Sequence, residues 1–193
     1  MPPKLKFTRE EIIQTALALT REKGIGAVTA RGLGKALGSS PQPVFGLFQN
    51  MEEVQREVLK ASESLYQRYL QKEISAGKMP PYKASGMAYI RFAEEEKELF
   101  KLLFMRDRSA ESKEENRDPI RPQLEMIQKN TGLSEDEAYL FHLEMWVCVH
   151  GIAAMIATNY LAWNADFISS VLTDFYLGLQ SRRCLGRNDH GSY

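Results

Sequence analysis

The sequence is poor in the residues that most often carry reactive or metal-binding chemistry, with two cysteines and three histidines in 193 residues. Two cysteines, Cys148 and Cys184, are too few for a disulfide scaffold and favour a reducing, cytoplasmic setting. His142 and His150 lie eight residues apart, with Glu144 and Cys148 between them. Glu144 and Cys148 have the helical spacing of metal ligands, but neither histidine is aligned with them, so we expect no metal site.

Catalytic motifs are missing as well. The sequence contains no Gly-rich phosphate loop, no Ser-centred nucleophile elbow and no paired-carboxylate motif, so we expect neither an enzyme nor a bound cofactor. The acidic run Glu94, Glu95, Glu96 and Glu98 is predicted to be a solvated helix face rather than a cation site. His150 is expected to be a buried, hydrogen-bonded group.

Net charge is also absent, because 25 Lys and Arg balance 25 Asp and Glu. The balance is uneven along the chain: residues 1–50 hold seven Lys or Arg against three Glu. The amino terminus, MPPKLKFTREE, lacks the apolar run of a signal peptide. Residues 145–165 carry no formal charge and have the length of a membrane span. However, His150, Thr158 and Asn159 interrupt the stretch and basic flanks are lacking, so we expect a buried helix and no membrane.

No period-two alternation of apolar residues occurs, whereas helical spacing runs through nearly the whole chain, so the predicted fold is all-α. A capping box at Thr8 and Glu11 begins the first predicted helix, which Gly24 ends. Thr29 and Ser40 are expected to cap two short helices, and Asn50 a long one that continues toward Gly77. Further helices are predicted around residues 84–90, 99–104, 120–127, 135–160 and 167–179, with an exposed loop at 106–119.

The segment from Thr29 to Phe48 reads TARGLGKALGSSPQPVFGLF. It contains two short amphipathic helical patterns about a Gly-containing turn, which is the layout of a helix-turn-helix and points to DNA. The second half of this segment, where a recognition helix would meet base edges, contains no Lys, Arg or Asn. The expected DNA-reading surface therefore has few polar side chains.

These residues resemble the DNA-binding head of the TetR family of bacterial regulators, from Phe7 to about Leu59. The matching features are the helix end at Gly24, the TARGLGKALG-SSP turn, the pair Phe45 and Phe48, and Asn50 before a long helix. WVCVHG, residues 146–151, resembles the Trp-His-Gly type of carboxy-terminal domain in that family. The resemblance implies a helix-turn-helix head at residues 1–50, a connecting helix at about 51–77, a helical regulatory and dimerisation domain at 78–183 and a tail at 184–193.

The recognition helix departs from the family pattern in ways that affect DNA binding. The family usually has Tyr at the position of Phe45, and its hydroxyl contacts a phosphate. It often has a polar or basic residue at Leu47, and at Met51 it has a Lys that also contacts the DNA backbone. Their loss should weaken binding to any sequence. Gln42 is the best predicted base reader, since its amide can pair bidentately with adenine. The full set of predicted DNA contacts is Lys4, Lys6, Thr29, Arg31, Ser39, Ser40, Gln42 and Phe45, with Lys35 adding charge and Phe48 expected in the core.

The resemblance also implies a homodimer whose last two helices form a four-helix interface. We expect the stripe Ile168, Leu172, Phe175 and Leu179 to form it, with Phe167 and Val171 on a second stripe that the sequence cannot rank against the first. Residues 82–104 and 124–155 should line a site for a small-molecule effector. The predicted function is a ligand-responsive transcriptional regulator, expected to be a repressor that binds a pseudo-palindromic operator. The alternative is a ligand-binding or protein-interaction module of the same fold that has lost specific DNA recognition.

Overall fold

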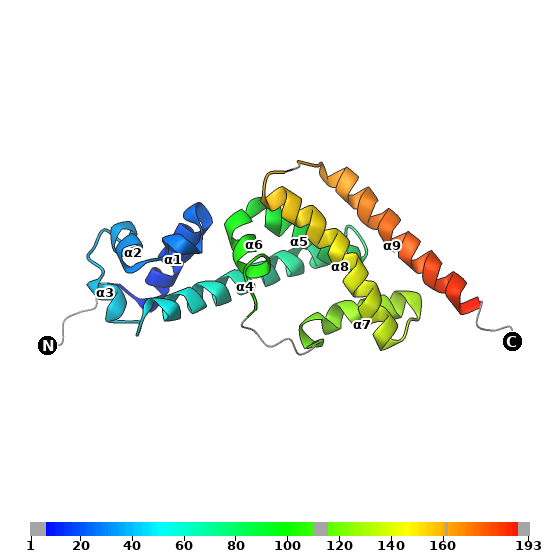
Figure 1. Ribbon diagram of the computed structural model, residues 1–193, viewed down its shortest axis with the longest axis horizontal. Helices are drawn as coiled ribbons and strands as arrows, with labels where there is room; N and C mark the ends of the chain where they lie inside the picture. The colour runs from blue at the N-terminus through cyan, green and yellow to red at the C-terminus, as the bar shows by residue number, and fades with distance from the viewer. Residues whose placement is uncertain (1–6, 110–115, 161, 189–193) are drawn as a thin grey trace. The chain divides into compact units, whose positions relative to one another are not determined.

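The computed structural model describes residues 7–109, 116–160 and 162–188, and all regular structure in those ranges is helical (Figure 1). Two compact units account for the packing. The head unit comprises residues 7–68 and 95–108, and the body unit comprises 69–94 and the described residues beyond 108. The all-α prediction is therefore confirmed. The boundaries of the units differ from the expected ones, because the head unit includes most of the connecting helix and one helix from the middle of the chain.

The first helix of the head unit, α1 (Arg9–Lys23), begins at the predicted capping box. The Thr8 hydroxyl oxygen accepts a hydrogen bond from the Glu11 N–H, and the Glu11 carboxylate accepts one from the Thr8 N–H at 2.7 Å. Gly24, at φ 77°, ends the helix, and a short 3-10 turn, η1 (Ile25–Ala27), follows. The amino-terminal helix thus begins and ends where its local sequence predicts.

The two short helices that follow are α2 (Ala30–Ala36) and α3 (Gln42–Phe45). Thr29 caps α2 as predicted, accepting a hydrogen bond from the Gly32 N–H at 3.0 Å. The predicted cap at Ser40 is wrong: α3 begins after Pro41, which already has helical backbone angles and makes no side-chain cap. Because Pro41 is fixed near φ −65°, it has helical backbone angles without a hydroxyl cap before it, and α3 begins one residue later than expected.

The head unit is completed by two helices from further along the chain. The long helix α4 (Met51–Ser75) starts where expected, and the Asn50 side-chain oxygen accepts the Glu53 N–H at 2.8 Å. The short helix α6 (Lys97–Phe104) packs against α1. Arg21 on α1 donates two hydrogen bonds to the Glu96 carboxylate, at 2.7 and 2.8 Å. The acidic run is therefore not simply a solvated face, because this long-range ion pair uses one of its members.

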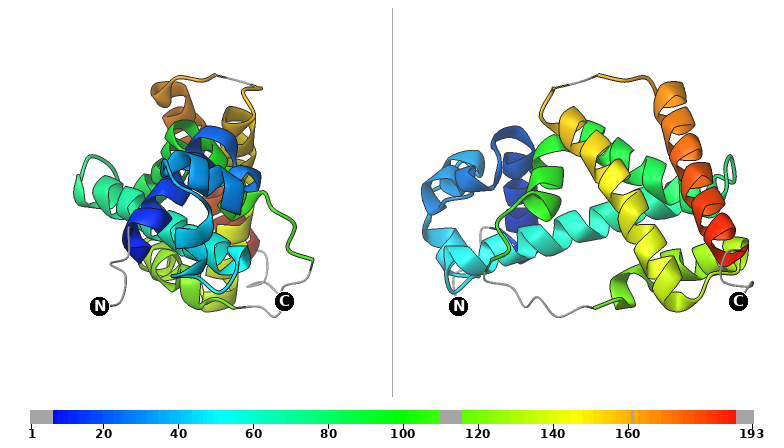
Figure 2. Two further views of the ribbon diagram at one scale, coloured as in Figure 1. Left: turned by 90° about the vertical axis from the view of Figure 1, so that its left-hand side faces the viewer. Right: turned by 45° about the vertical axis from the view of Figure 1, so that its right-hand side comes forward.

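The body unit is built from α5 (Pro81–Glu95), α7 (Arg121–Thr131), α8 (Glu135–Ala157) and α9 (Ala165–Asn188), with the 3-10 turn η2 (Asp118–Ile120) before α7. A capping box at Ser134 and Glu137 begins α8, next to the predicted helix start at residue 135. Helix α8 packs against both α7 and α9, and α8 and α9 run in opposite directions (Figure 2). The core of the body unit includes Tyr82, Ile127, Leu133, Ala138, Phe141, Met145 and Leu179.

Helix α8 is long and apolar enough, by length and composition, to cross a membrane, and it is the one helix among the described residues with this property. Its polar side chains have partners inside the body unit, however. Glu144 bonds to Arg182 and Arg183 of α9, and His142 and His150 bond to tyrosines of α5. These contacts attach α8 to α5 and α9 within the body unit.

Candidate DNA-binding surface and regulatory body

The turn between α2 and α3 is held by close backbone packing at Gly34. A Cβ atom on Gly34 would lie 3.0 Å from the Ser39 carbonyl oxygen and 3.1 Å from the Pro41 nitrogen. The Ser39 N–H also donates to the Gly34 carbonyl at 2.8 Å. Gly38 supplies the positive φ of 60° at which the chain leaves α2. The predicted helix-turn-helix is thus present, with glycine at the point of closest approach.

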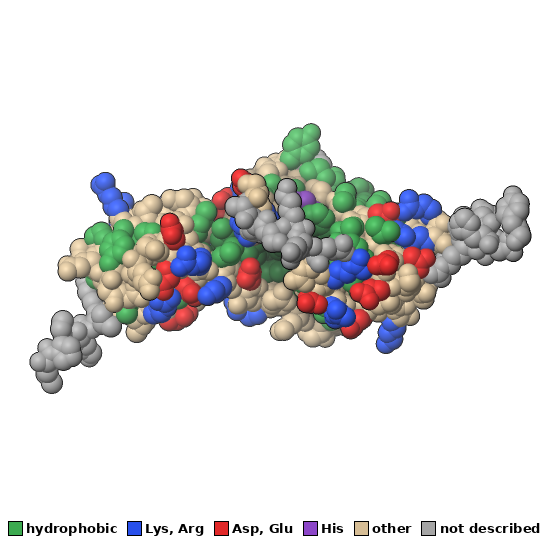
Figure 3. Space-filling model, turned by 60° about the horizontal axis from the view of Figure 1, so that its bottom comes forward, with side chains coloured by type: hydrophobic (Ala, Val, Ile, Leu, Met, Phe, Trp, Pro, Cys, Tyr) green, Lys and Arg blue, Asp and Glu red, His purple; other side chains and the backbone are tan. Residues whose placement is uncertain are grey.

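The exposed face of α3 carries the predicted base-reading residues. Gln42 is exposed and Phe45 is 51% exposed, whereas Val44 and Phe48 are buried, at 0% and 3%. Ser40 is exposed and Ser39 is partly buried. Figure 3 shows hydrophobic side chains gathered on the surface at the end of the head unit that carries α2 and α3. The structure therefore separates the two phenylalanines: Phe48 belongs to the core, as predicted, and Phe45 to the surface.

The predicted backbone contacts are arranged around α2. Thr29, Arg31 and Lys35 are all exposed. The Thr29 hydroxyl oxygen accepts the Gly32 N–H as the cap of α2, and its O–H can still donate to a phosphate. Lys4 and Lys6, the predicted amino-terminal arm, lie outside the described residues.

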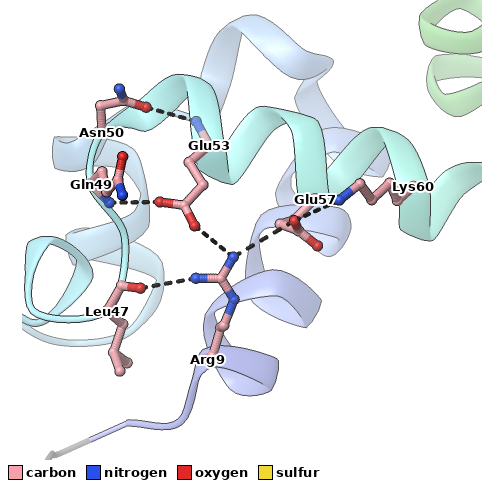
Figure 4. A network of polar contacts seen from close by, with 7 residues as sticks. All are labelled: Arg9, Leu47, Gln49, Asn50, Glu53, Glu57 and Lys60. Atoms are coloured by element: carbon pink, nitrogen blue, oxygen red, sulfur yellow. Dashed lines mark hydrogen bonds and ion pairs between the residues drawn. The ribbon is translucent and has the colours of Figure 1, made fainter.

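A cluster of polar contacts around Arg9 holds the segment that follows α3, from Leu47 to Glu53 (Figure 4). The Arg9 guanidinium donates to the Leu47 carbonyl at 2.9 Å and to the Glu53 carboxylate at 2.7 Å, and it lies 4.2 Å from the centre of the Phe48 ring. Glu53 in turn accepts the Gln49 N–H at 2.7 Å. The Gln49 N–H and the Arg9 guanidinium lower the pKa of Glu53. Arg9 thereby joins α1 to the segment between α3 and α4.

Sequence reasoning did not single out Arg9. Its partners Leu47 and Glu53 are 38 and 44 residues away, so no local spacing indicates them. The available signal was weak: Arg9 follows the cap of α1, and Glu53 follows the cap of α4. The sequence does not show that these two helix starts meet in space.

In the body unit, two tyrosines of α5 bond to the two histidines of α8. The Tyr82 hydroxyl lies 3.1 Å from His142 Nδ1, and the Tyr89 hydroxyl lies 2.8 Å from His150 Nδ1. Burial lowers the pKa of His142 to about 4 and also lowers the pKa of His150. The expected hydrogen bond of His150 is confirmed. Both histidines are therefore neutral near pH 7, and the tautomer of each ring sets whether its Nδ1 accepts from the tyrosine hydroxyl or donates to it.

The Trp146 side chain stacks on His150, with ring centroids 4.8 Å apart and an angle of 20° between the ring planes. Cys148 on the same helix is a free thiol whose pKa is raised by burial, so it is a poor nucleophile. Among the described residues, no group of three or more His, Cys, Asp or Glu is placed to hold a metal ion. The WVCVHG segment thus contributes an aromatic and hydrogen-bonded seam between α5 and α8.

The predicted dimer stripe is mostly buried inside the body unit. Ile168, Leu172 and Leu179 are 4%, 3% and 9% exposed, and Phe175 is 39% exposed. The Leu172 side chain packs toward α5, 3.5 Å from where a Cβ on Gly86 would lie. The sequence-based choice of stripe therefore needs correction for these three residues, because neighbouring helices of the same chain already cover them. The large apolar side chains that α8 and α9 leave exposed are Leu140, Leu143, Trp146, Val147, Phe167, Phe175 and Leu177.

Glu144 fastens α8 to α9 beside this exposed set. Its carboxylate accepts hydrogen bonds from Arg182 at 2.5 Å and from Arg183 at 2.9 Å. Burial alone would raise the pKa of Glu144, but the two arginines outweigh it and lower the pKa. The exposed apolar residues of α8 and α9 thus lie on two helices that are joined by ion pairs of Glu144 with Arg182 and Arg183.

A helix-turn-helix head followed along the chain by an all-helical body is the arrangement of a class of one-component regulators. Residues 82–173 match the family described as tetracyclin repressor-like, C-terminal domain. This match supports a TetR-family regulator, in agreement with the resemblance that the head and the WVCVHG segment carry. A search of curated proteins found no match. The family assignment points to a regulator rather than an enzyme.

Proposed function

We propose that this protein is a ligand-responsive transcriptional repressor that binds a pseudo-palindromic operator as a homodimer in the cytoplasm. The observation that carries the proposal is the pairing of a TetR-family body with a helix-turn-helix whose α3 exposes Gln42 and Phe45. Two heads related by a two-fold axis would enter successive major grooves about one helical turn apart. Arg31 and Lys35, exposed on α2, would contact phosphates.

The dimer surface in this proposal is the exposed apolar face of α8 and α9, including Leu140, Val147 and Leu177. These side chains are 52%, 66% and 53% exposed in the single chain. A second copy is the proposed occupant because TetR-type regulators dimerise in general, and a two-fold interface buries the same surface on both subunits. Ile168, Leu172 and Leu179 support this surface from within the subunit.

The effector site is proposed in the body unit, on α5, α7 and α8. The sequence-based expectation also included the residues of α6, which are left out here because α6 packs in the head unit. The side chains available there include aromatic rings and the tyrosine hydroxyls and neutral imidazoles of the two tyrosine–histidine pairs. An effector regulates DNA binding only if it prefers one arrangement of the heads over the other.

Binding to DNA is the test. Fluorescence anisotropy is measured with duplexes from upstream of the chain's own gene and with random duplex of equal length, at low and moderate salt. We expect the upstream DNA to bind more tightly, with an affinity that falls steeply as salt rises. Equal affinity for upstream and random duplexes would favour the alternative function, a module that has kept the fold and lost sequence recognition. The four-residue α3, which has no charged side chain, is what gives that alternative weight.

A further inference from the structure

The exposed surface of α3 is chemically simple. It presents one amide, Gln42, and one large apolar side chain, Phe45, three residues apart on the same side of the helix. Within residues 7–68, Phe45 is the one large hydrophobic side chain found largely exposed. Gly46, directly after it, has no side chain to shield the ring. With one large apolar side chain largely exposed, α3 offers less hydrophobic surface than a protein interface needs.

We infer that Phe45 reads the 5-methyl group of a thymine in the major groove, beside an adenine that Gln42 reads. The inference rests on the proposed function. Thymine is the base that presents an apolar group in the major groove, and apolar side chains are the partners that fit it. Adenine presents the donor and acceptor that a glutamine amide matches. A surface with one amide and one ring thus suits A·T pairs and offers no bidentate donor for guanine.

The spacing of the two side chains agrees with this assignment. Three residues of α-helix advance by about 4.5 Å. Successive base pairs are separated by about 3.4 Å along the duplex. Gln42 and Phe45 can therefore reach adjacent or next-adjacent base pairs. Each half-site should contain at least one thymine whose methyl group matters, close to an adenine.

The packing under α3 holds Phe45 in place. Val44 and Phe48 on either side of it in sequence are buried, and Arg9 binds the Leu47 carbonyl two residues on. The ring therefore projects from an anchored turn, so burying it against a methyl group requires little reorganisation of the backbone. A fixed apolar surface is what allows a contact as small as one methyl group to discriminate between bases.

The experiment begins with selection of preferred sites by the full-length protein from random duplexes. Each thymine of the enriched half-site is then replaced singly by deoxyuridine, which removes the methyl group and keeps the base pair. We expect one thymine at which wild-type affinity falls by about fourfold per half-site, as for the loss of one buried methyl group. Placing 5-methylcytosine there should bind more tightly than cytosine.

Two variants separate the readers. Phe45→Ala should bind thymine and deoxyuridine sites equally, whereas Gln42→Ala should keep the thymine preference and lose the adenine preference. Phe45 is exposed, so this variant should unfold at the wild-type temperature, which circular dichroism checks. If an enriched site exists but no deoxyuridine substitution weakens binding, the inference is overturned and the proposed DNA binding stands. If no sequence is enriched, the proposed function fails, and the inference fails with it.

Discussion

Gly34 shows how a single missing side chain sets the geometry of the DNA-binding surface. Three backbone atoms of Ser39, Ser40 and Pro41 lie 3.0–3.2 Å from the position that a Cβ on Gly34 would occupy. Backbone atoms cannot move aside as the end of a flexible side chain can. The distance between α2 and α3 therefore depends on this residue having no side chain.

We predict that Gly34→Ala destabilises the protein by up to about 2 kcal/mol and weakens operator binding. Overpacking typically costs about 1–3 kcal/mol, and the gain in helix propensity of about 1 kcal/mol offsets it only in part. Urea unfolding and anisotropy measure the two effects. Gly26→Ala is the matched control, since nothing lies within 4 Å of a Cβ at Gly26. A Gly34→Ala protein as stable and as active as this control would contradict the packing described.

His142 gives the body unit an acid sensitivity whose sign follows from its burial. The folded pKa is about 4, whereas the ordinary value is 6.5. Below pH 6.5 the unfolded chain takes up a proton that the folded chain excludes, so stability is complete above pH 6.5 and falls as the pH approaches 4. The full effect is about 3 kcal/mol at most.

His142→Gln removes this titration and keeps an acceptor for the Tyr82 hydroxyl. As the pH falls from 6.5 to 4, we expect the unfolding free energy of the wild type to decrease relative to that of the variant. Urea unfolding at several pH values in that range measures it, and the carboxylates cancel because both proteins contain them. A difference that stays constant across the range would show that His142 is not the titrating group.

At the scale of elements, the position of α3 depends on contacts made outside it. The helix has four residues, too few to be stable alone, and the Arg9 guanidinium connects its carboxy-terminal side to α1 and α4. The α1–α6 packing, with the Arg21–Glu96 ion pair, similarly attaches a helix from the middle of the sequence to the head unit. Short elements thus take their place from long-range polar contacts.

Arg9→Lys tests this dependence. A lysine keeps the charge but cannot donate to the Leu47 carbonyl and the Glu53 carboxylate from one planar fork. We predict that affinity for the preferred operator falls more than affinity for random duplex, with a loss of about 1 kcal/mol in stability for the missing hydrogen bond. Anisotropy with both duplexes gives the ratio. Arg68→Lys, on an exposed part of α4, is the control, and an equal fall in both affinities would point to a phosphate contact by Arg9 instead.

At the scale of the whole molecule, the apolar face of α8 and α9 bears on assembly. We predict a dimer at micromolar concentration and its dissociation by Leu140→Lys combined with Val147→Lys, because two charges would be buried at the two-fold interface. Light scattering measures the mass. Gln71→Lys, exposed on α4, adds a charge elsewhere and should leave the dimer intact. A monomeric wild-type protein would refute the proposed surface.

The all-α fold, most helix starts and the helix-turn-helix could be predicted from the sequence, because these features depend on residues within a few positions of one another. The caps at Thr8, Thr29, Asn50 and Ser134 are local side-chain-to-backbone contacts and were predictable for that reason. Ser40 was the exception, since Pro41 set the backbone before a cap was needed. The candidate DNA-reading residues Gln42 and Phe45 could likewise be chosen from their place in the motif.

Tertiary packing sets which apolar stripe faces inward and which side chains meet across the fold. Ile168, Leu172 and Leu179 are covered by their own subunit, and the sequence cannot rank two stripes of one helix without knowing the neighbours. The pairs Tyr82–His142 and Tyr89–His150 join residues 60 and 61 positions apart. Periodicity records that a face is apolar, but the identity of its partner depends on the packing of helices distant in sequence, so only the folded chain specifies it.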